Sequence, residues 1–383
     1  MHAMLDAREI ETRTPPPSGL APMPAAGSPA LPHAADALQR RLGAAKRSYA
    51  TRRIDMARAA DLLTGDVSPR PGDLVLARIV QLGHHKRIES PEGRRAELYI
   101  GDEVLLCYGA RYASDQFEAL VPPDLGPCEM VAGGGIAARA VARHSATRAP
   151  TRIAPLGLVA DRAGRVLNLA DHALGACRAT GNAPYTIAVL GTSMNAGKTT
   201  TAAALVRGLT ACGFRPGAVK VTGTGAGGDR WALVDAGAAP VLDFTDFGHA
   251  STYRVPVAET VSILRRARGH LAAAGCDVAV VEIADGLLFP ETSGLIEMPE
   301  ARALIDGAVV AAGDALGAVA SVACLDRLGV SVLAVAGKLT SSPLAVREAA
   351  SALMQPIVPL DALTGGLWLA PALAARRRAE AVS

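Results

Sequence analysis

The sequence predicts an α/β protein in two parts: a parallel sheet flanked by helices in the second half, and a smaller, mostly β domain before it. Beyond Pro184, apolar strand-like runs alternate with helical patterns, which is typical of parallel strands joined by right-handed crossovers. Between residues 70 and 122, short strand-like runs are separated by turn dipeptides instead, which indicates a small antiparallel barrel or sandwich. At 383 residues the chain is long enough for both domains.

The composition narrows the classes of partner. Hydrophobic residues make up 50% and charged residues 20%, a balance that suits a globular protein with buried parallel strands. Aromatic residues make up 3% and the formal net charge is +3, so we expect no nucleic-acid partner. No apolar window reaches the roughly 20 residues that span a bilayer, and the start of the chain does not resemble a secretory signal. We therefore expect no membrane partner and a cytoplasmic location, and the sequence is compatible with a homodimer.

Changes in composition divide the chain into four segments. Residues 1–33 are rich in Pro and Ala and are expected to form a flexible tail. Residues 34–125 are expected to form a helix plus a small β domain, and a basic helical pattern continues to about residue 63. Residues 126–183 are expected to be a transitional segment, and residues 184–383 form the α/β domain.

Short strands are expected within the first of these domains. The candidates are residues 74–80, 96–100 and 103–108. In the transitional segment, three glycines at residues 133–135 indicate a flexible turn, and residues 165–169 indicate a further short strand.

Two polar features of the β domain stand out without matching a motif. One is the pair His84-His85 and the other is the segment formed by residues 111–118. Neighbouring residues on a strand point their side chains to opposite sides, so we expect no metal shared by the two histidines.

A phosphate-binding loop is the strongest motif in the sequence. The apolar run at residues 186–190 suits a central strand, and it leads directly into residues 191–199, which match G-x-x-x-x-G-K-[ST]. The glycines let the backbone turn tightly so that amide N–H groups converge on phosphate oxygens, and the helix that opens near Lys198 adds the positive end of its dipole. Lys198 should neutralise the β- and γ-phosphates, and the Thr199 hydroxyl should bind Mg²⁺.

The nucleotide is expected to lie along this loop and against the end of the last strand. Lys338 follows that last strand, at the edge of the sheet where the base would rest. The residues expected to contact the nucleotide are Gly191, Thr192, Ser193, Met194, Asn195, Ala196, Gly197, Lys198, Thr199, Thr200 and Lys338.

The strand after the first crossover ends in a lysine and a glycine-rich loop. Ligands of parallel sheets bind beyond the carboxyl ends of the strands, so this loop should face the same cleft as the phosphate loop. Lys220 is expected to neutralise charge on the transferring phosphoryl group or on an anionic substrate, and the alternative is a structural or surface lysine. The residues expected on the substrate side are Thr222, Gly223, Thr224 and Gly225.

Two acids are candidate ligands for Mg²⁺. Asp229 opens the helix after the glycine-rich loop, where it could reach a metal or simply cap that helix. Glu282 ends a buried strand-like run, and phosphate-loop proteins have the acid that holds or polarises Mg²⁺ at this position. Asp285 is the second candidate for the same role. The expected metal ligands are Thr199, Asp229 and Glu282, and the expected catalytic residues are Lys198, Lys220 and Glu282.

Taken in order, these motifs resemble dethiobiotin synthetase and the SIMIBI class of P-loop NTPases over about residues 184–360. In that family a lysine and a Thr-Gly pair line the site after the second strand, and the resemblance places them at Lys220 and at Thr222-Gly223. The family's aspartate and glutamate ligands for Mg²⁺ correspond to Asp229 and Glu282.

A second resemblance is to the dethiobiotin-synthetase-like family that contains D-glutamate N-acetyltransferase. It rests on the pairs Thr222-Gly223, Asp243-Phe244, Val281-Glu282, Leu288-Phe289 and Ser293-Gly294. The chain departs from dethiobiotin synthetase in having Ile283-Ala284-Asp285 where that family has small glycines. It also has Gly337-Lys338 where that family offers an asparagine to adenine.

Motifs and resemblances together imply a Mg-ATP-dependent enzyme that activates a small carboxylate, carbamate or amine substrate by phosphoryl transfer. Two alternatives stay open, an N-acyltransferase like the D-glutamate enzyme and a regulatory or accessory P-loop NTPase that acts on a protein partner. The expected cofactors are ATP and Mg²⁺, and the expected partner is a small-molecule substrate.

Overall fold

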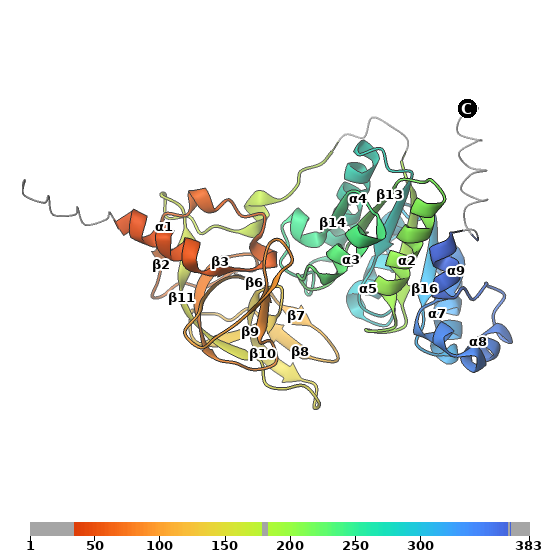
Figure 1. Cartoon of the computed structure of the whole chain (residues 1–383), viewed down its shortest axis with the longest axis horizontal. Helices are drawn as coiled ribbons and strands as arrows, with labels where there is room; N and C mark the ends of the chain where they lie inside the picture. Colours follow the sequence, from red (N-terminus) through yellow and green to blue (C-terminus); the bar gives the residue numbers. More distant parts are fainter. Residues whose placement is uncertain (1–33, 178–182, 367, 369–383) are drawn as a thin grey trace, which may run out of the picture.

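Two domains lie side by side in this protein, a β domain followed by an α/β domain (Figure 1). The computed structural model describes residues 34–177, 183–366 and 368, so the flexible tail expected for residues 1–33 lies outside the described residues. Across the described part of the chain, no helix combines the length and the apolar character that crossing a bilayer requires.

The first helix is shorter than the sequence pattern predicts. Helix α1 (Ala34–Ala44) does not continue to residue 63. The chain forms instead β1 (Lys46–Arg47), the 3₁₀ turns η1 (Tyr49–Thr51) and η2 (Met56–Arg58), and β2 (Asp61–Leu63). Tertiary contacts decide this, because β1 pairs with β6 of the barrel and the Arg47 guanidinium donates to three backbone carbonyls between Thr51 and Ile54. These contacts satisfy groups that a longer helix would have paired within itself.

The β domain is built around a small closed barrel. Its strands are β3 (Leu74–Gln81), β6 (Glu103–Tyr108), β9 (Cys128–Ala132), β10 (Ile136–Arg143) and β11 (Thr151–Ala160). The pairings run β6-β3-β11-β9-β10, and β10 pairs with β6 again, which closes the circuit. Along β3, Leu74 and Leu76 enter one apolar cluster while Val75 and Ala77 enter another, so both faces of this strand are buried.

Shorter strands extend and flank the barrel. They are β4 (Arg87–Glu89), β5 (Arg95–Glu97), β7 (Arg111–Tyr112) and β8 (Phe117–Leu120). Strands β4 and β5 form a separate hairpin, whereas β8 pairs with β10 and β7 pairs with β8. The polar segment noted at residues 111–118 therefore lies at the edge of the β domain.

Three of the five barrel strands come from the segment that was expected to be transitional. Strands β9, β10 and β11 all lie between residues 126 and 183, and the glycines at 133–135 form the turn that joins β9 to β10. Strand β10 is rich in Ala, which has low β-propensity, so its pairing partners rather than its own pattern place it in the sheet. The strand expected at residues 165–169 is reduced to isolated bridges at Val166 and Asn168, followed by η3 (Leu169–His172).

The α/β domain contains a six-stranded parallel sheet with the order β14-β13-β15-β12-β16-β17. The strands are β12 (Tyr185–Gly191), β13 (Pro216–Lys220), β14 (Val241–Asp243), β15 (Val278–Glu282), β16 (Gly307–Ala311) and β17 (Val332–Ala336). In the register of the sheet, Glu282 of β15 lies beside Val189 on one side and Lys220 on the other, and Lys220 lies beside Asp243. The carboxyl ends of these strands thus gather charged residues at one edge, where parallel sheets bind ligands.

Helices cover both faces of this sheet, as the predicted alternation requires. One face packs against α4 (Val257–Ala273), α5 (Pro290–Glu297), α6 (Pro299–Arg302), α7 (Ala315–Arg327) and α8 (Pro343–Ala350). The other packs against α2 (Lys198–Ala211), α3 (Gly228–Ala236) and α9 (Leu360–Gly365) (Figure 1). Two 3₁₀ turns, η4 (Phe244–Phe247) and η5 (Lys338–Ser341), follow strands β14 and β17.

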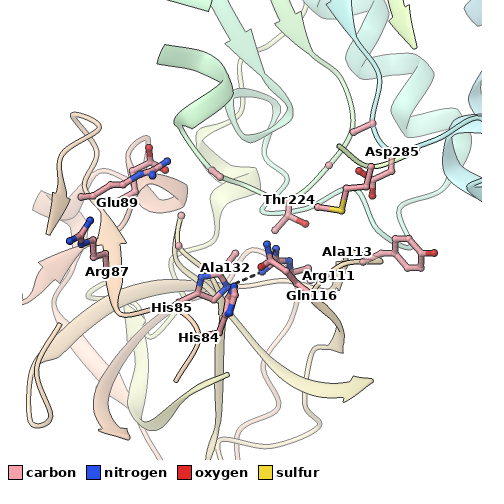
Figure 2. A pocket seen from close by; sticks show the side chains of 18 of the residues that line it. His84, His85, Arg87, Glu89, Arg111, Ala113, Gln116, Ala132, Thr224 and Asp285 are labelled. Carbon is pink, nitrogen blue, oxygen red and sulfur yellow. Dashed lines mark hydrogen bonds between the residues drawn. The ribbon is translucent and has the colours of Figure 1, made fainter. Parts of the chain in front are cut away.

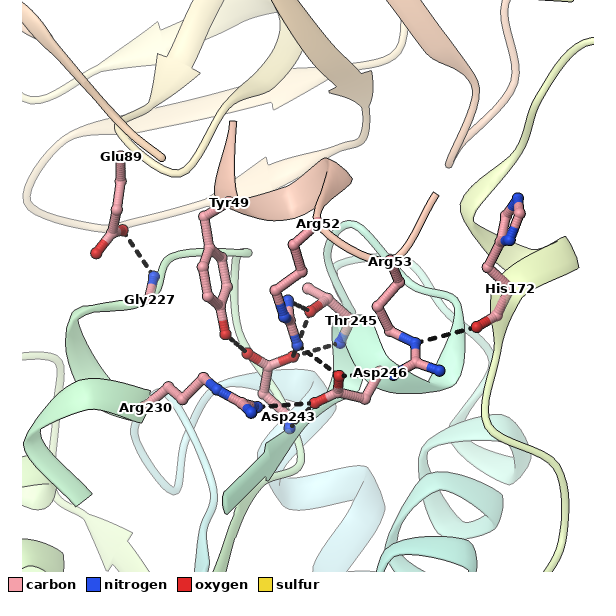
Figure 3. A network of polar contacts seen from close by, with 10 residues as sticks. All are labelled: Tyr49, Arg52, Arg53, Glu89, His172, Gly227, Arg230, Asp243, Thr245 and Asp246. Atoms are coloured by element: carbon pink, nitrogen blue, oxygen red, sulfur yellow. Dashed lines mark hydrogen bonds and ion pairs between the residues drawn. The ribbon is translucent and has the colours of Figure 1, made fainter. Parts of the chain in front are cut away.

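A buried charged network joins the two domains (Figure 3). From the β domain, Arg52 Nη2 lies 2.7 Å from Asp246 Oδ1 and 3.2 Å from Asp243 Oδ1, and the Tyr49 hydroxyl donates to Asp243. From within the α/β domain, Arg230 Nη1 lies 3.1 Å from Asp246 Oδ2. Both carboxylates are buried, with 3% of each residue exposed, so they depend on these cations for their charge balance.

The same contacts determine the direction in which the pKa values of Asp243 and Arg52 shift. Burial by itself would raise the pKa of Asp243, but the Arg52 guanidinium outweighs it and holds the pKa below its usual range. Conversely, burial would lower the pKa of Arg52, but Asp243 and Asp246 raise it above its usual value. Asp243 and Arg52 are therefore both charged at neutral pH.

We predict that Arg52→Met lowers the free energy of unfolding by about 3 to 5 kcal/mol, because it leaves the buried Asp243 carboxylate without a cation within 4.0 Å among the described residues, whereas Asp246 keeps Arg230. A pKa depressed in the folded state contributes stability that is present above the unfolded pKa of about 3.9 and is lost as pH falls through the folded value. Wild-type stability should therefore fall in the acid range, and the variant should lose part of that dependence. Urea titration followed by circular dichroism measures both.

The matched control is Arg165→Met, which removes an arginine paired with Asp161 at 2.9 Å while 74% of its side chain is exposed. Its effect should stay within about 0.5 kcal/mol, because the Asp161 carboxylate keeps the backbone amides of Ala163 and Arg165 as donors and Arg58 at 3.7 Å. Equal stability of the Arg52 and Arg165 variants would contradict the importance of the network.

Candidate functional site

The phosphate-binding loop has the predicted local structure. It begins where β12 ends at Gly191 and closes where α2 begins at Lys198, with Gly197 in the left-handed region at φ 103°. A side chain at position 191 would place its Cβ 2.8 Å from Lys198 Cδ, so the glycine lets the lysine cross the strand end. Lys198 Nζ donates to the Ser193 carbonyl at 2.9 Å, which holds the ammonium inside the loop.

This loop forms one wall of a cavity of about 410 Å³ at the carboxyl edge of the sheet. Of the residues expected to contact the nucleotide, those that line it are Met194, Asn195, Gly197, Lys198, Thr199, Thr200 and Lys338. The remaining members of that set, Gly191, Thr192, Ser193 and Ala196, are not among its lining residues. The loop after β17 is attached directly to the phosphate loop, because the Lys338 amide donates to the Ala196 carbonyl at 3.0 Å.

The three expected metal ligands come together in this cavity. The Thr199 hydroxyl lies 3.0 Å from Asp229 Oδ1 and 3.1 Å from Glu282 Oε1. Because a hydroxyl has one proton, it can donate a hydrogen bond to only one of these oxygens at a time. Lys220 lies between the same carboxylates, since its ammonium donates to Asp229 and is 3.5 Å from Glu282 Oε1. The residues that the sequence predicts to lie together are thus joined by direct contacts in the structure.

The charges in this cluster are set by burial and by Lys220. Burial would lower the pKa of Lys220, but Asp229 and Glu282 raise it above its ordinary range, so the group stays an ammonium. Burial raises the pKa of Glu282, and Lys220 only partly offsets this. For Asp229, burial acts in the same direction, but Lys220 outweighs it and the pKa falls below the usual value. Lys198 has a lowered pKa because it is buried, with Asp285 and Glu282 acting in the opposite direction.

The donor set fits a magnesium ion that is also held by nucleotide phosphates. Glu282 Oε2 is buried and has no hydrogen-bond partner among the described residues, so one carboxylate oxygen is available to a cation. Mg²⁺ is usually held by one or two carboxylates plus phosphates and waters, rather than by a cage of protein ligands. In agreement, the described residues contain no group of three or more His, Cys, Asp or Glu that could hold a metal alone.

The residues expected on the substrate side separate into two pairs. Gly223 and Thr224 line a second, larger cavity. Thr222 is fully buried, and its hydroxyl exchanges hydrogen bonds with the backbone of Ala284 at 2.6 and 2.7 Å, so it fixes the loop to the end of β15. Gly225 is also not among the lining residues, because its amide pairs with the Ala250 carbonyl at 2.9 Å. The sequence pattern could not separate these pairs because it does not show which way each backbone group faces.

The larger cavity is a cleft of about 670 Å³ between the two domains (Figure 2). The α/β domain contributes Lys220, Thr224 and Asp285, and the β domain contributes His85 and Arg111, among others. The glycine turn of the barrel closes one side, and it approaches so closely that a Cβ at Gly134 would lie 2.0 Å from the Gly225 carbonyl oxygen.

Sequence reasoning missed the contribution of the β domain to this site. Residues 111–118 were noted as polar but had no assigned role, and they contact the phosphate loop directly. Asn195 of that loop donates to Asp115 Oδ2 at 2.7 Å, and the Tyr112 ring stacks on Phe289 with centroids 4.3 Å apart. We expected the two histidines to lie on a strand with their rings on opposite sides. They lie instead in a loop, with ring centroids 4.8 Å apart.

A phosphate-binding loop between a central parallel strand and a helix, with carboxylates at the ends of neighbouring strands, defines the nucleotide-binding fold of the P-loop NTPases. The fold class predicted from the sequence is therefore confirmed, including the smaller, mostly β domain before it.

Comparison with family models and with curated proteins finds no match. Among solved structures, the chain is similar to the signal recognition particle receptor FtsY from Elizabethkingia anophelis, with 17% identity and a TM-score of 0.31. The match covers 50% of this chain and 55% of that chain, so this protein spans about half the length of that relative.

Two further structures overlap with a similar share of this chain. One is a nucleotide-binding protein in complex with ADP from Archaeoglobus fulgidus, with 13% identity, a TM-score of 0.33, and coverage of 47% of this chain and 85% of that chain. The other is the signal recognition particle 54 kDa protein from Aeropyrum pernix K1 in complex with GDP, with 18% identity and a TM-score of 0.28. That match covers 51% of this chain and 40% of that chain.

We predict that Lys198→Ala lowers nucleotide affinity by about tenfold or more, because a charge-assisted contact to phosphate contributes about 1.5 to 3 kcal/mol. The fold should persist, since the ammonium contacts a loop carbonyl rather than the apolar core. Calorimetric titration with a non-hydrolysable ATP analogue and circular dichroism measure the two effects. Lys86→Ala, at an exposed position, is the control, and an unchanged affinity in the Lys198 variant would refute the assignment.

A separate prediction concerns Glu282. Replacing it with Gln keeps the shape but removes the charge that would hold Mg²⁺, so Mg²⁺-dependent nucleotide affinity should fall much more than affinity measured in EDTA. Titrations of wild type and variant under both conditions give the comparison. If both affinities fell by the same factor, Glu282 would have no part in metal binding.

Proposed function

We propose that this protein is a Mg-ATP-dependent enzyme that transfers the γ-phosphoryl group to a small molecule held in the cleft between its domains. One observation carries this proposal: the nucleotide cavity and the cleft have Met194, Lys220, Ala284 and Asp285 in common among their lining residues. A small molecule in the cleft would therefore lie next to phosphates bound on the loop, which is the arrangement that direct transfer requires.

Each charged group at this junction has a role in such a reaction. Lys198 and the loop amides would hold the β- and γ-phosphates, and Thr199, Asp229 and Glu282 would hold Mg²⁺, which neutralises developing charge on the phosphates. Lys220 would stabilise the negative charge that spreads over the transferring group, because its ammonium is already fixed in place by two carboxylates.

Where the attacking group is an amine, Asp285 is suited to accept its proton. It lines both cavities, and burial raises its pKa above the usual value, with Lys198 acting in the opposite direction. A base with a raised pKa takes up a proton more readily near neutral pH. The resemblance of residues 184–360 to dethiobiotin synthetase supports phosphoryl transfer to a carboxylate, carbamate or amine as the reaction class.

We predict that Lys220→Ala lowers substrate-dependent ADP formation by about 100-fold or more, while affinity for an unreactive ATP analogue stays within a few fold of wild type. Lys220→Arg should not restore turnover, because the planar guanidinium group of arginine cannot take the place of a compact ammonium between two carboxylates. The measurement is a coupled ADP assay over a panel of small acids and amines.

Lys86→Ala is the matched control, since Lys86 lines the rim of the cleft and is exposed. It should retain at least half of the wild-type rate by the same assay, about 0.4 kcal/mol in barrier height. Full activity of Lys220→Arg would remove Lys220 from the reaction, and the absence of ADP formation with every acid and amine would count against phosphoryl transfer itself.

A further inference from the structure

The cleft contains a buried cation whose charge no close carboxylate neutralises. Arg111 in β7 is only 6% exposed and lines the cleft. Its Nη2 donates to Gln116 Oε1 at 2.9 Å, its Nη1 lies 3.1 Å from His85 Nε2, and its Nε is buried without a partner. Within residues 34–177 and 183–366, Arg111 forms no ion pair within 4.0 Å.

Burial of this charge is costly without an anion. Burial lowers the pKa of Arg111 to about 10, and the more distant Asp115 and Asp285 act in the opposite direction without reversing it. The group is therefore still a cation at neutral pH. Asp115 does not pair with Arg111 within 4.0 Å: its Oδ2 accepts from Asn195 at 2.7 Å, and its Oδ1 is buried without a hydrogen-bond partner among the described residues. A buried charge in this position needs a partner that the protein itself does not place beside it.

The neighbours of Arg111 leave donors free for such a partner. Burial lowers the pKa of His85 to about 3, so its ring is neutral and cannot compete as a cation. His85 Nε2 lies 2.9 Å from the Val131 carbonyl as well as 3.1 Å from Arg111 Nη1, and a neutral ring nitrogen serves as donor or as acceptor but not as both. Of five N–H groups on the guanidinium, Gln116 takes one and His85 takes at most one.

We propose that Arg111 binds a carboxylate group of the small molecule that occupies the cleft. The planar guanidinium matches a carboxylate in geometry as well as in charge, and the low dielectric of a buried site strengthens the contact. Calling that molecule the substrate rests on the function proposed above, whereas the binding site itself does not.

This assignment also orients the ligand. Arg111 and the histidines come from the β domain, while Lys220 and Asp285 line the cleft from the α/β domain (Figure 2). For the reaction proposed above, the reacting group has to lie beside Lys220, which lines both cavities, and therefore on a different part of the molecule from the carboxylate that Arg111 holds. The substrate class is thus a small carboxylic acid whose reacting group lies at the end away from the carboxylate that Arg111 holds.

The sharpest test replaces the neighbour rather than the arginine. Gln116→Glu places a carboxylate of nearly the same shape where Arg111 Nη2 already donates, so it supplies the missing counter-charge from within the protein. We expect the variant to melt at a higher temperature than wild type and to bind succinate at least about tenfold more weakly. A residue that only supports the fold would not move these two readouts in opposite directions.

Succinate binding to the full chain is measured by calorimetry at low ionic strength, both without nucleotide and with Mg-ADP present. Arg111→Gln should lose succinate binding, Arg111→Lys should keep part of it, and Arg95→Gln, which changes an exposed arginine at the rim, should bind within about twofold of wild type. If Arg111→Gln fails to fold, the melting temperature and the succinate affinity of Gln116→Glu still test the proposal.

Three results would overturn the proposal: no succinate binding by wild type, equal succinate affinity in wild type and Gln116→Glu, or a loss in Arg95→Gln as large as in Arg111→Gln. Failure of the proposed reaction is recognised separately, because it would appear as succinate binding that depends on Arg111 with no ADP formed from any acid or amine.

Discussion

The contact between Arg52 and the two buried aspartates is the interaction on which the rest of the site depends. Asp243 ends β14 beside Lys220 in the register of the sheet, and Asp246 follows in η4. By pairing with both, Arg52 places the β domain against the carboxyl edge of the sheet, where the phosphate loop lies. Because both carboxylates are buried, the domains cannot separate here without exposing or unpairing charge.

A consequence of this arrangement is that one lysine faces two environments. Lys220 is fixed by Asp229 and Glu282 on the nucleotide side, and it also lines the cleft that the β domain completes. An ammonium held in this way keeps its charge and its position, so little reorganisation is needed when negative charge develops nearby. The barrel is therefore part of the active site we propose, and not an appendage to a nucleotide-binding domain.

Glycine has a specific use at the domain interface. At Gly134 the turn at residues 133–135 approaches the Gly225 carbonyl oxygen so closely that this position tolerates no side chain without movement. In the sequence that turn reads as a flexible connection. In the structure it is a close-packed boundary of the cleft, because two backbones meet there and glycine alone leaves them room.

Patterns in the sequence were enough to predict the parallel sheet, the phosphate loop and the grouping of Lys220, Asp229 and Glu282. These follow from local patterns, since a strand, a glycine loop and a helix lie consecutively in the chain, and parallel strands bring their carboxyl ends to one edge. The other half of the site depends on how the two domains pack together. Arg111 and His85 line the same cleft as Lys220 although they lie more than 100 residues from it in the chain, and no local sequence pattern predicts this arrangement. The same limit hid the burial of Thr222 and the Ala-rich strand β10, whose positions are set by partners distant in sequence rather than by their own propensities.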